Sequence, residues 1–148
     1  MRYILGIALT GALGAFAIAD EKVDETAKKL AGTYTLTELL IEGKPNPKAE
    51  KVKSVEIKDG VICVKDGEKS EDAAFKLDPS KTPMEIDLTP KLGKSTKVLG
   101  IYQTKETDKG LELTIAFIHD GGNGNDRRPK DFKGEGKDEV VMKLLRKK

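Results

Sequence analysis

Residues 84–89 read MEIDLT, and this stretch decides the fold class because apolar and polar residues alternate along it without a break. A period of two places Met84, Ile86 and Leu88 on one face of a β-strand and their polar neighbours on the other. One face of such a strand is buried and the other is solvated. The stretch therefore predicts a β-sheet with a single buried face.

The same alternation, or an enrichment in β-forming residues, recurs on both sides of this stretch and is separated by short turn sequences. Asp59-Gly60 is the two-residue signature of a tight hairpin. The predicted strands are residues 33–41, 52–58, 61–65, 73–77, 84–89, 98–104, 111–118 and 139–146. Sequential strands joined by tight turns are antiparallel neighbours, and closing such a meander removes its exposed edges. We therefore predict an all-β fold, an eight-stranded antiparallel up-and-down barrel.

A short helix is predicted to precede the first strand. Val23, Ala27 and Leu30 are spaced as one apolar stripe of a helix over residues 20–31, and Gly32 is a plausible stop.

Residues 1–19 have the three regions of a cleavable signal peptide. Arg2 supplies the positive start, residues 4–17 are mainly apolar, and Ala17-Ile18-Ala19 is an A-x-A cleavage pattern. The alternative is an uncleaved anchor, but a bilayer core requires about 20 apolar residues. We expect cleavage after Ala19, export to the periplasm or beyond, and a single soluble domain over residues 20–148 with no membrane span.

Composition argues against several classes of partner. The chain has 27 Lys and Arg against 25 Asp and Glu, interleaved along its length, so no basic stripe for nucleic acid is evident. The single cysteine, Cys63, cannot form an internal disulfide. Its apolar run, residues 61–64, predicts a small buried side chain and not a reactive thiol.

Six segments together resemble an uncharacterised family of small exported domains that is expanded in planctomycete-type bacteria. In order, they are residues 30–34 (LAGTY), 77–79 (LDP), 86–89 (IDLT), 100–102 (GIY), 128–129 (RP) with Phe132, and 141–146 (VMKLLR). The resemblance spans nearly all of residues 20–148. It implies no activity, because that family has none established.

Gly32, Tyr34 and Arg146 carry a second resemblance, to the lipocalin-like group. Those barrels open with Gly-x-Trp, and an Arg from late in the chain packs across the Trp; here Tyr34 replaces the Trp. The resemblance implies a structural Tyr34–Arg146 pair and a barrel that binds a small apolar molecule. Alternatively, Gly32 only ends the helix and Tyr34 is an ordinary strand aromatic.

No catalytic constellation is evident, and we predict that the chain is not an enzyme. His119 is the only histidine, and Ser54, Ser70, Ser80 and Ser95 lie in polar or turn sequences without a nucleophile-elbow context.

Residues 121–126 match GGxGxD, the start of a calcium-binding repeat, but such repeats work as tandem stacks and this is one copy. We predict no catalytic, cofactor or metal site. Residues 120–126 are instead expected to form a lid over one barrel end, with Arg127, Arg128 and Phe132 anchoring its far side.

Two functions remain open from the sequence. The first is a non-enzymatic binding module that holds a small apolar ligand inside the barrel; the second is a structural or protein-interaction module of the cell envelope with a filled core. The size of the inward side chains distinguishes them. The expected inward residues are mostly large: Tyr34, Leu36, Ile57, Phe75, Met84, Ile86, Leu88, Leu113, Ile115, Phe117, Met142 and Leu144.

Overall fold

The computed structural model describes residues 25–91, 97–119 and 127–148. The signal peptide predicted for residues 1–19 lies outside these described residues, as does the calcium-like motif at 121–126. Export and single-domain organisation therefore remain predictions.

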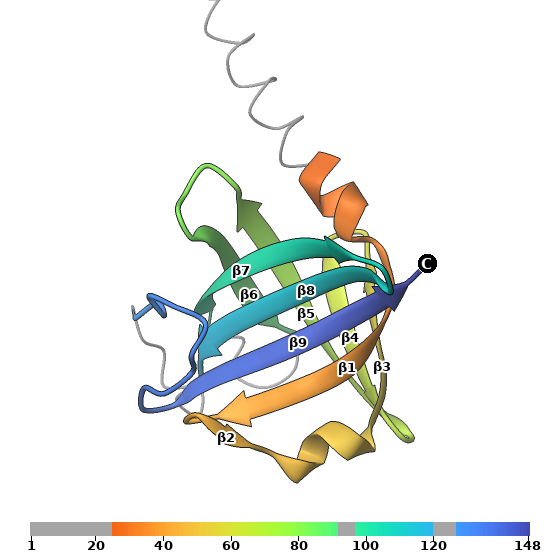
Figure 1. Cartoon of the computed structure of the whole chain (residues 1–148), viewed down its shortest axis with the longest axis horizontal. Helices are drawn as coiled ribbons and strands as arrows, with labels where there is room; N and C mark the ends of the chain where they lie inside the picture. The colour runs from red at the N-terminus through yellow and green to blue at the C-terminus, as the bar shows by residue number, and fades with distance from the viewer. Residues whose placement is uncertain (1–24, 92–96, 120–126) are drawn as a thin grey trace, which may run out of the picture.

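Nine strands form one antiparallel sheet that closes on itself (Figure 1). They are β1 (Gly32–Ile41), β2 (Lys44–Pro45), β3 (Val52–Lys58), β4 (Val61–Asp66), β5 (Lys69–Asp78), β6 (Met84–Pro90), β7 (Val98–Thr107), β8 (Gly110–Ile118) and β9 (Glu139–Lys147). From β3 onward each strand pairs with the next, β3 also pairs with β1, and β9 returns to β1. Apart from the two-residue β2, which lies beside the end of β1, the strands form the predicted eight-stranded up-and-down barrel.

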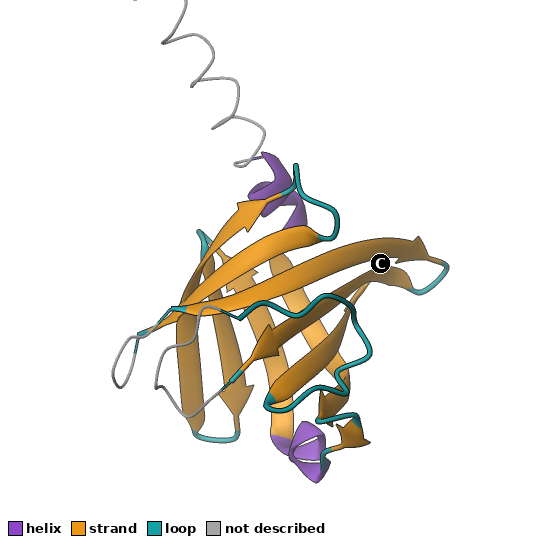
Figure 2. Cartoon of the chain, turned by 90° about the vertical axis from the view of Figure 1, so that its left-hand side faces the viewer, coloured by secondary structure: helices purple, strands orange, loops and turns teal. Residues whose placement is uncertain are grey.

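A short helix at residues 25–30 lies at one end of the barrel (Figure 2). Leu30 is buried in the interior cluster and Ala27 packs against that cluster. The described part of the predicted helix is therefore helical and helps to cover this end, which we call the closed end. Within the described residues, none of the helices has the length and apolar character of a membrane span.

The structure differs from the sequence prediction mainly in two regions, and β7 also extends three residues beyond its predicted end, to Thr107. The segment after β1 contains β2 and a 3-10 helix, η1 (Pro47–Lys51), where only a turn was predicted. Asn46 begins η1 by accepting a 2.8 Å hydrogen bond from the Lys48 amide. Strand β5 begins four residues earlier than predicted, at Lys69. Its first residues pair with β4, but they are polar and mostly exposed. With solvent on both faces, that half of β5 has no apolar period to reveal it.

The barrel interior is lined by large apolar side chains. All twelve residues predicted to face inward belong to the interior cluster, either buried within it or packed against it. The interior side chains with less than 2% exposure include Tyr34, Tyr102, Ile57, Ile86, Leu113, Ile115, Leu144 and Val55. Fully burying a side chain of this size is worth roughly 1.5–3 kcal/mol. The interior therefore serves as the hydrophobic core of the domain.

Cys63 corrects one expectation from the sequence. It pairs with Asp72 on β5 and Glu56 on β3, on the outer face, and it is partly exposed. Strand alternation places Ile62 and Val64 inside and their neighbour Cys63 outside, although the whole run is apolar. A hydrogen bond with Asp72, together with burial, raises the pKa of the Cys63 thiol. The thiol is therefore less reactive than an isolated one.

Ile115 and its neighbour Thr114 provide a matched test of this packing. Ile115 is 0% exposed in the interior, whereas Thr114 lies on the outer face. We expect Ile115→Ala to lower the free energy of unfolding by about 2–5 kcal/mol through the cavity it leaves, and Thr114→Ala to cost far less. Urea denaturation measures both, and equal costs would mean that the inward register of β8 is wrong.

Candidate functional site

Arg146, Tyr34 and Gly32 meet at the closed end of the barrel. The Arg146 guanidinium lies 5.8 Å from the centroid of the Tyr34 ring, within the range of a cation–π contact. Its Nη1 donates to the carbonyls of Lys29 and Ala31 at 2.8 and 2.6 Å. The end of β9 is thereby fastened to the helix that precedes β1.

Gly32 and the Tyr34 hydroxyl complete this contact. Gly32 has a φ of +143°, and a Cβ there would lie only 2.6 Å from the Arg146 Cδ. The arginine side chain therefore fills the space that the Cβ of any other residue would need. The Tyr34 hydroxyl donates to the Leu30 carbonyl at 2.8 Å. Burial raises the pKa of Tyr34 despite the nearby Arg146 charge, which keeps the hydroxyl a neutral donor. The three residues named from the sequence thus lie together, and their contacts join the end of β9 to the segment that precedes β1.

A segment on the outside of the barrel, residues 127–138, which we call the outer strap, is held mainly by Arg128. Its Nη1 donates to the Gly100 carbonyl at 2.6 Å and its Nη2 to the Asp87 carboxylate at 2.8 Å. The guanidinium also lies 3.6 Å from Glu85. One arginine side chain therefore joins the outer strap to β6 and β7.

Asp87 is the main acidic partner of Arg128. Burial opposes ionisation of its carboxyl, but hydrogen bonds from Arg128 and Lys97 outweigh burial and lower its pKa. A carboxyl whose pKa is lower in the folded chain stabilises the fold above its unfolded pKa, near 4, and loses this contribution as the pH falls through the folded value. The Arg128–Asp87 contact is therefore present at neutral pH.

The middle and far end of the outer strap are held by packing and backbone contacts. Phe132 packs on a small outer cluster of Ile101, Ala116 and Val141. Gly134 crosses Val141 so closely that a Cβ would lie 2.6 Å from its Cγ2. Residues 127–138 therefore lie along the side wall. Phe132 packs on the domain and Arg128 is anchored to the barrel, as predicted. The lid predicted for residues 120–126 lies outside the described residues and stays a prediction.

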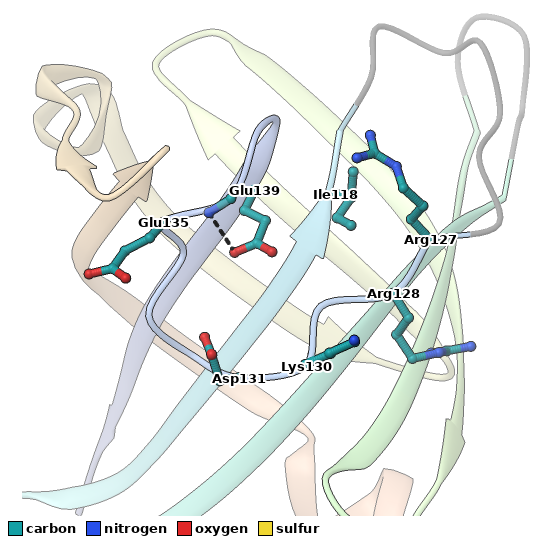
Figure 3. Close-up of a pocket in the computed structure, with 8 residues that line it drawn as sticks. Ile118, Arg127, Arg128, Lys130, Asp131, Glu135 and Glu139 are labelled. Carbon is teal, nitrogen blue, oxygen red and sulfur yellow. Dashed lines mark hydrogen bonds between the residues drawn. The ribbon is translucent and has the colours of Figure 1, made fainter.

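A pocket of about 540 Å³ lies between the outer strap and the ends of β8 and β9 (Figure 3). It is lined by Ile118, Arg127, Arg128, Lys130, Asp131, Glu135, Gly136 and Glu139. The carboxylates of Asp131 and Glu139 point into the space within the strap, whereas Glu135 points away. The Gly136 amide donates to Glu139 at 3.2 Å. The pocket is open, carries both signs of charge, and lies on the outer surface of the barrel.

The described residues that were considered for catalysis lie apart from one another. His119 is exposed at the end of β8, and among the described residues no hydrogen bond joins its side chain to a serine. Ser54 and Ser70 lie at the starts of β3 and β5, Ser80 follows β5, and Ser95 lies outside the described residues. Within residues 25–91, 97–119 and 127–148, no three His, Cys, Asp or Glu side chains group closely enough to hold a metal.

The comparisons with family models, curated proteins and solved structures find no match to this chain. Five of the six segments that carry the resemblance meet in two places; residues 77–79 belong to neither. Residues 30–34 and Arg146 form the contact at the closed end, and residues 86–89, 100–102, 128–129 and Phe132 hold the outer strap. Sequence reasoning noted these residues but missed the Arg128–Asp87 contact, because no local pattern links residues 41 positions apart.

The outer strap provides a test through Arg128→Lys. Lysine keeps the charge but cannot donate in two directions from one planar group. Because the present hydrogen bonds involve charged groups, we expect the free energy of unfolding to fall by about 1–3 kcal/mol, as measured by urea denaturation.

The matched control is Lys133→Arg, a charge-conserving change on an exposed strap residue whose side chain forms no hydrogen bond among those described. Its stability should stay within about 0.5 kcal/mol of the wild type. At a pH low enough to protonate Asp87, the cost of Arg128→Lys should shrink. A cost that does not depend on pH would show that the Asp87 contact contributes nothing.

Proposed function

We propose that this chain is an exported, non-enzymatic structural or protein-interaction module of the cell envelope, with the barrel acting as a packed scaffold. The observation that carries the proposal is the filled interior. Tyr34, Tyr102 and Ile115 are each at most 1% exposed, and they come from three different strands of the barrel. Ile57 of β3 and Ile86 of β6 are also 1% exposed, so large side chains enter from other parts of the barrel wall as well. Such side chains leave the central section of an eight-stranded barrel as a core and not as a container.

The outer surface supports the same proposal. The pocket described above lies outside the barrel, and its lining is charged and open where a site for a small apolar ligand is typically enclosed and apolar. The proposal of export rests on the three-part pattern of residues 1–19. The proposal that the chain is not an enzyme rests on the sequence as a whole, in which no catalytic constellation is evident.

A small apolar ligand is the second candidate, favoured by the end of the barrel opposite the helix. Val98 begins β7, and Phe117 and Met142 lie near the end of β8 and the start of β9. All three belong to the rim of the interior cluster and are only partly buried. A ligand held here would contact the rim of the core without entering its centre.

Ligand content distinguishes the two candidates. We expect protein purified from its native host to carry no apolar molecule in native mass spectrometry, and to show no saturable increase in the fluorescence of 1-anilinonaphthalene-8-sulfonate. Leu113→Ala incubated with benzene is the positive control for native mass spectrometry, because a dry engineered void of about 150 Å³ can bind benzene. An apolar molecule bound to the wild type in one-to-one ratio would favour the second candidate.

Export has its own test. Intact-mass analysis of the protein from its native host should give a chain that starts at Asp20, because signal peptidase cleaves after the A-x-A pattern. An Ala17→Leu, Ala19→Leu variant should keep its leader, since cleavage requires small residues there. Recovery of the full-length wild-type chain in the cytoplasm would contradict export.

A further inference from the structure

Tyr102 places a polar group inside the barrel, and no described residue pairs with it. It lies on β7 opposite Met84 of β6 and Ile115 of β8, and it is 1% exposed. Its hydroxyl oxygen is fully buried, and no group among the described residues forms a hydrogen bond with it. Tyr34, the other fully buried tyrosine, donates to the Leu30 carbonyl at 2.8 Å. Both tyrosines are thus fully buried, but only the Tyr34 hydroxyl has a hydrogen-bond partner among the described residues.

No acceptor of the described residues lies within hydrogen-bond distance of the Tyr102 hydroxyl. Its strand neighbours are apolar. The nearby charged group is Asp78, which ends β5 opposite Glu85, the residue after Met84. The Oδ1 of Asp78 accepts hydrogen bonds from the amide and hydroxyl of Ser80. Burial, and then the charge of Asp78, raise the pKa of Tyr102, so the group is a neutral donor at neutral pH.

A buried hydroxyl in this position needs an explanation. The large majority of buried side-chain polar groups in proteins have a hydrogen-bond partner, because an unpaired group has lost its hydration without replacement. Phenylalanine would fill the same ring volume without that penalty. Among the interior residues, the phenol of Tyr102 is therefore the one that packing alone does not account for.

We infer that the Tyr102 hydroxyl is a binding site, inside the barrel, for one small guest that presents a single hydrogen-bond-accepting oxygen. A buried water molecule and the polar end of a small, otherwise apolar molecule supply the same chemistry. The inference goes beyond the proposed function and does not depend on it. A packed scaffold accommodates one water, since a water needs only about 10–15 Å³ of accessible space.

Tyr102→Phe, compared with Tyr34→Phe, tests the site by the sign of the effect. If a guest pairs with the Tyr102 hydroxyl, removing it breaks a hydrogen bond, and the Tm should fall by about 3–5 °C, as expected for Tyr34→Phe. If the hydroxyl is unpaired, its removal eliminates the free-energy penalty of burying an unpaired polar group, and the Tm should stay the same or rise. A Tm of Tyr102→Phe equal to or above that of the wild type would overturn the inference.

A second measurement on the wild type identifies the guest and does not require the variant to fold. Water bound at the site gives a rotating-frame Overhauser cross-peak between water and the Tyr102 ring hydrogens, with a native mass equal to that of the chain. A bound molecule instead adds its own mass under native conditions, and this addition should disappear in Tyr102→Phe. Absence of both the cross-peak and the added mass would overturn the inference, while the filled-core proposal would stand.

Discussion

Pairing between the first and last strands closes the barrel, and the remaining structure depends on it. The β1–β9 ladder runs from Thr35–Leu145 to Ile41–Val140, whereas β1 pairs with β3 only over Gly32, Thr33 and Tyr34. Without β9, β1 would pair with the rest of the sheet over three residues only, because β2 pairs with β1 alone. The interior could not then be filled from all sides, since Tyr34 and Leu36 reach the core from β1.

Two side-chain contacts reinforce that closure from opposite ends. At the closed end, Arg146 joins β9 to the backbone of residues 29–31 just ahead of β1. At the other end, the Asp138 amide donates to Glu42, next to β1, and the Glu42 amide donates to the Glu139 carbonyl. The outer strap continues from Asp138 across the side wall to Arg128, on β6 and β7. These contacts connect parts of the chain that the ladder alone leaves independent.

Sequence periodicity predicts most of this fold, because in a strand with one buried face the alternation of apolar and polar residues indicates which side chains point inward. The twelve inward residues and the Asp59-Gly60 hairpin follow from local patterns. The first half of β5 does not, since its residues are solvated on both faces. The position of Cys63 was missed because its neighbours are apolar on both faces of β4. The contacts of Arg128 and of Glu42 join residues 41 and 96 positions apart, and only the closed barrel brings them together.

Hydrogen exchange of backbone amides, measured residue by residue by NMR, tests the dependence on closure most directly. Amides that open only when the whole domain unfolds exchange most slowly. If β1–β9 pairing holds the barrel, the amides of the ladder from Thr35 to Ile41 should exchange as slowly as those of β8 in the core. Fast exchange along this ladder, with β3 to β8 still protected, would show that the sheet persists without closure and would contradict the account.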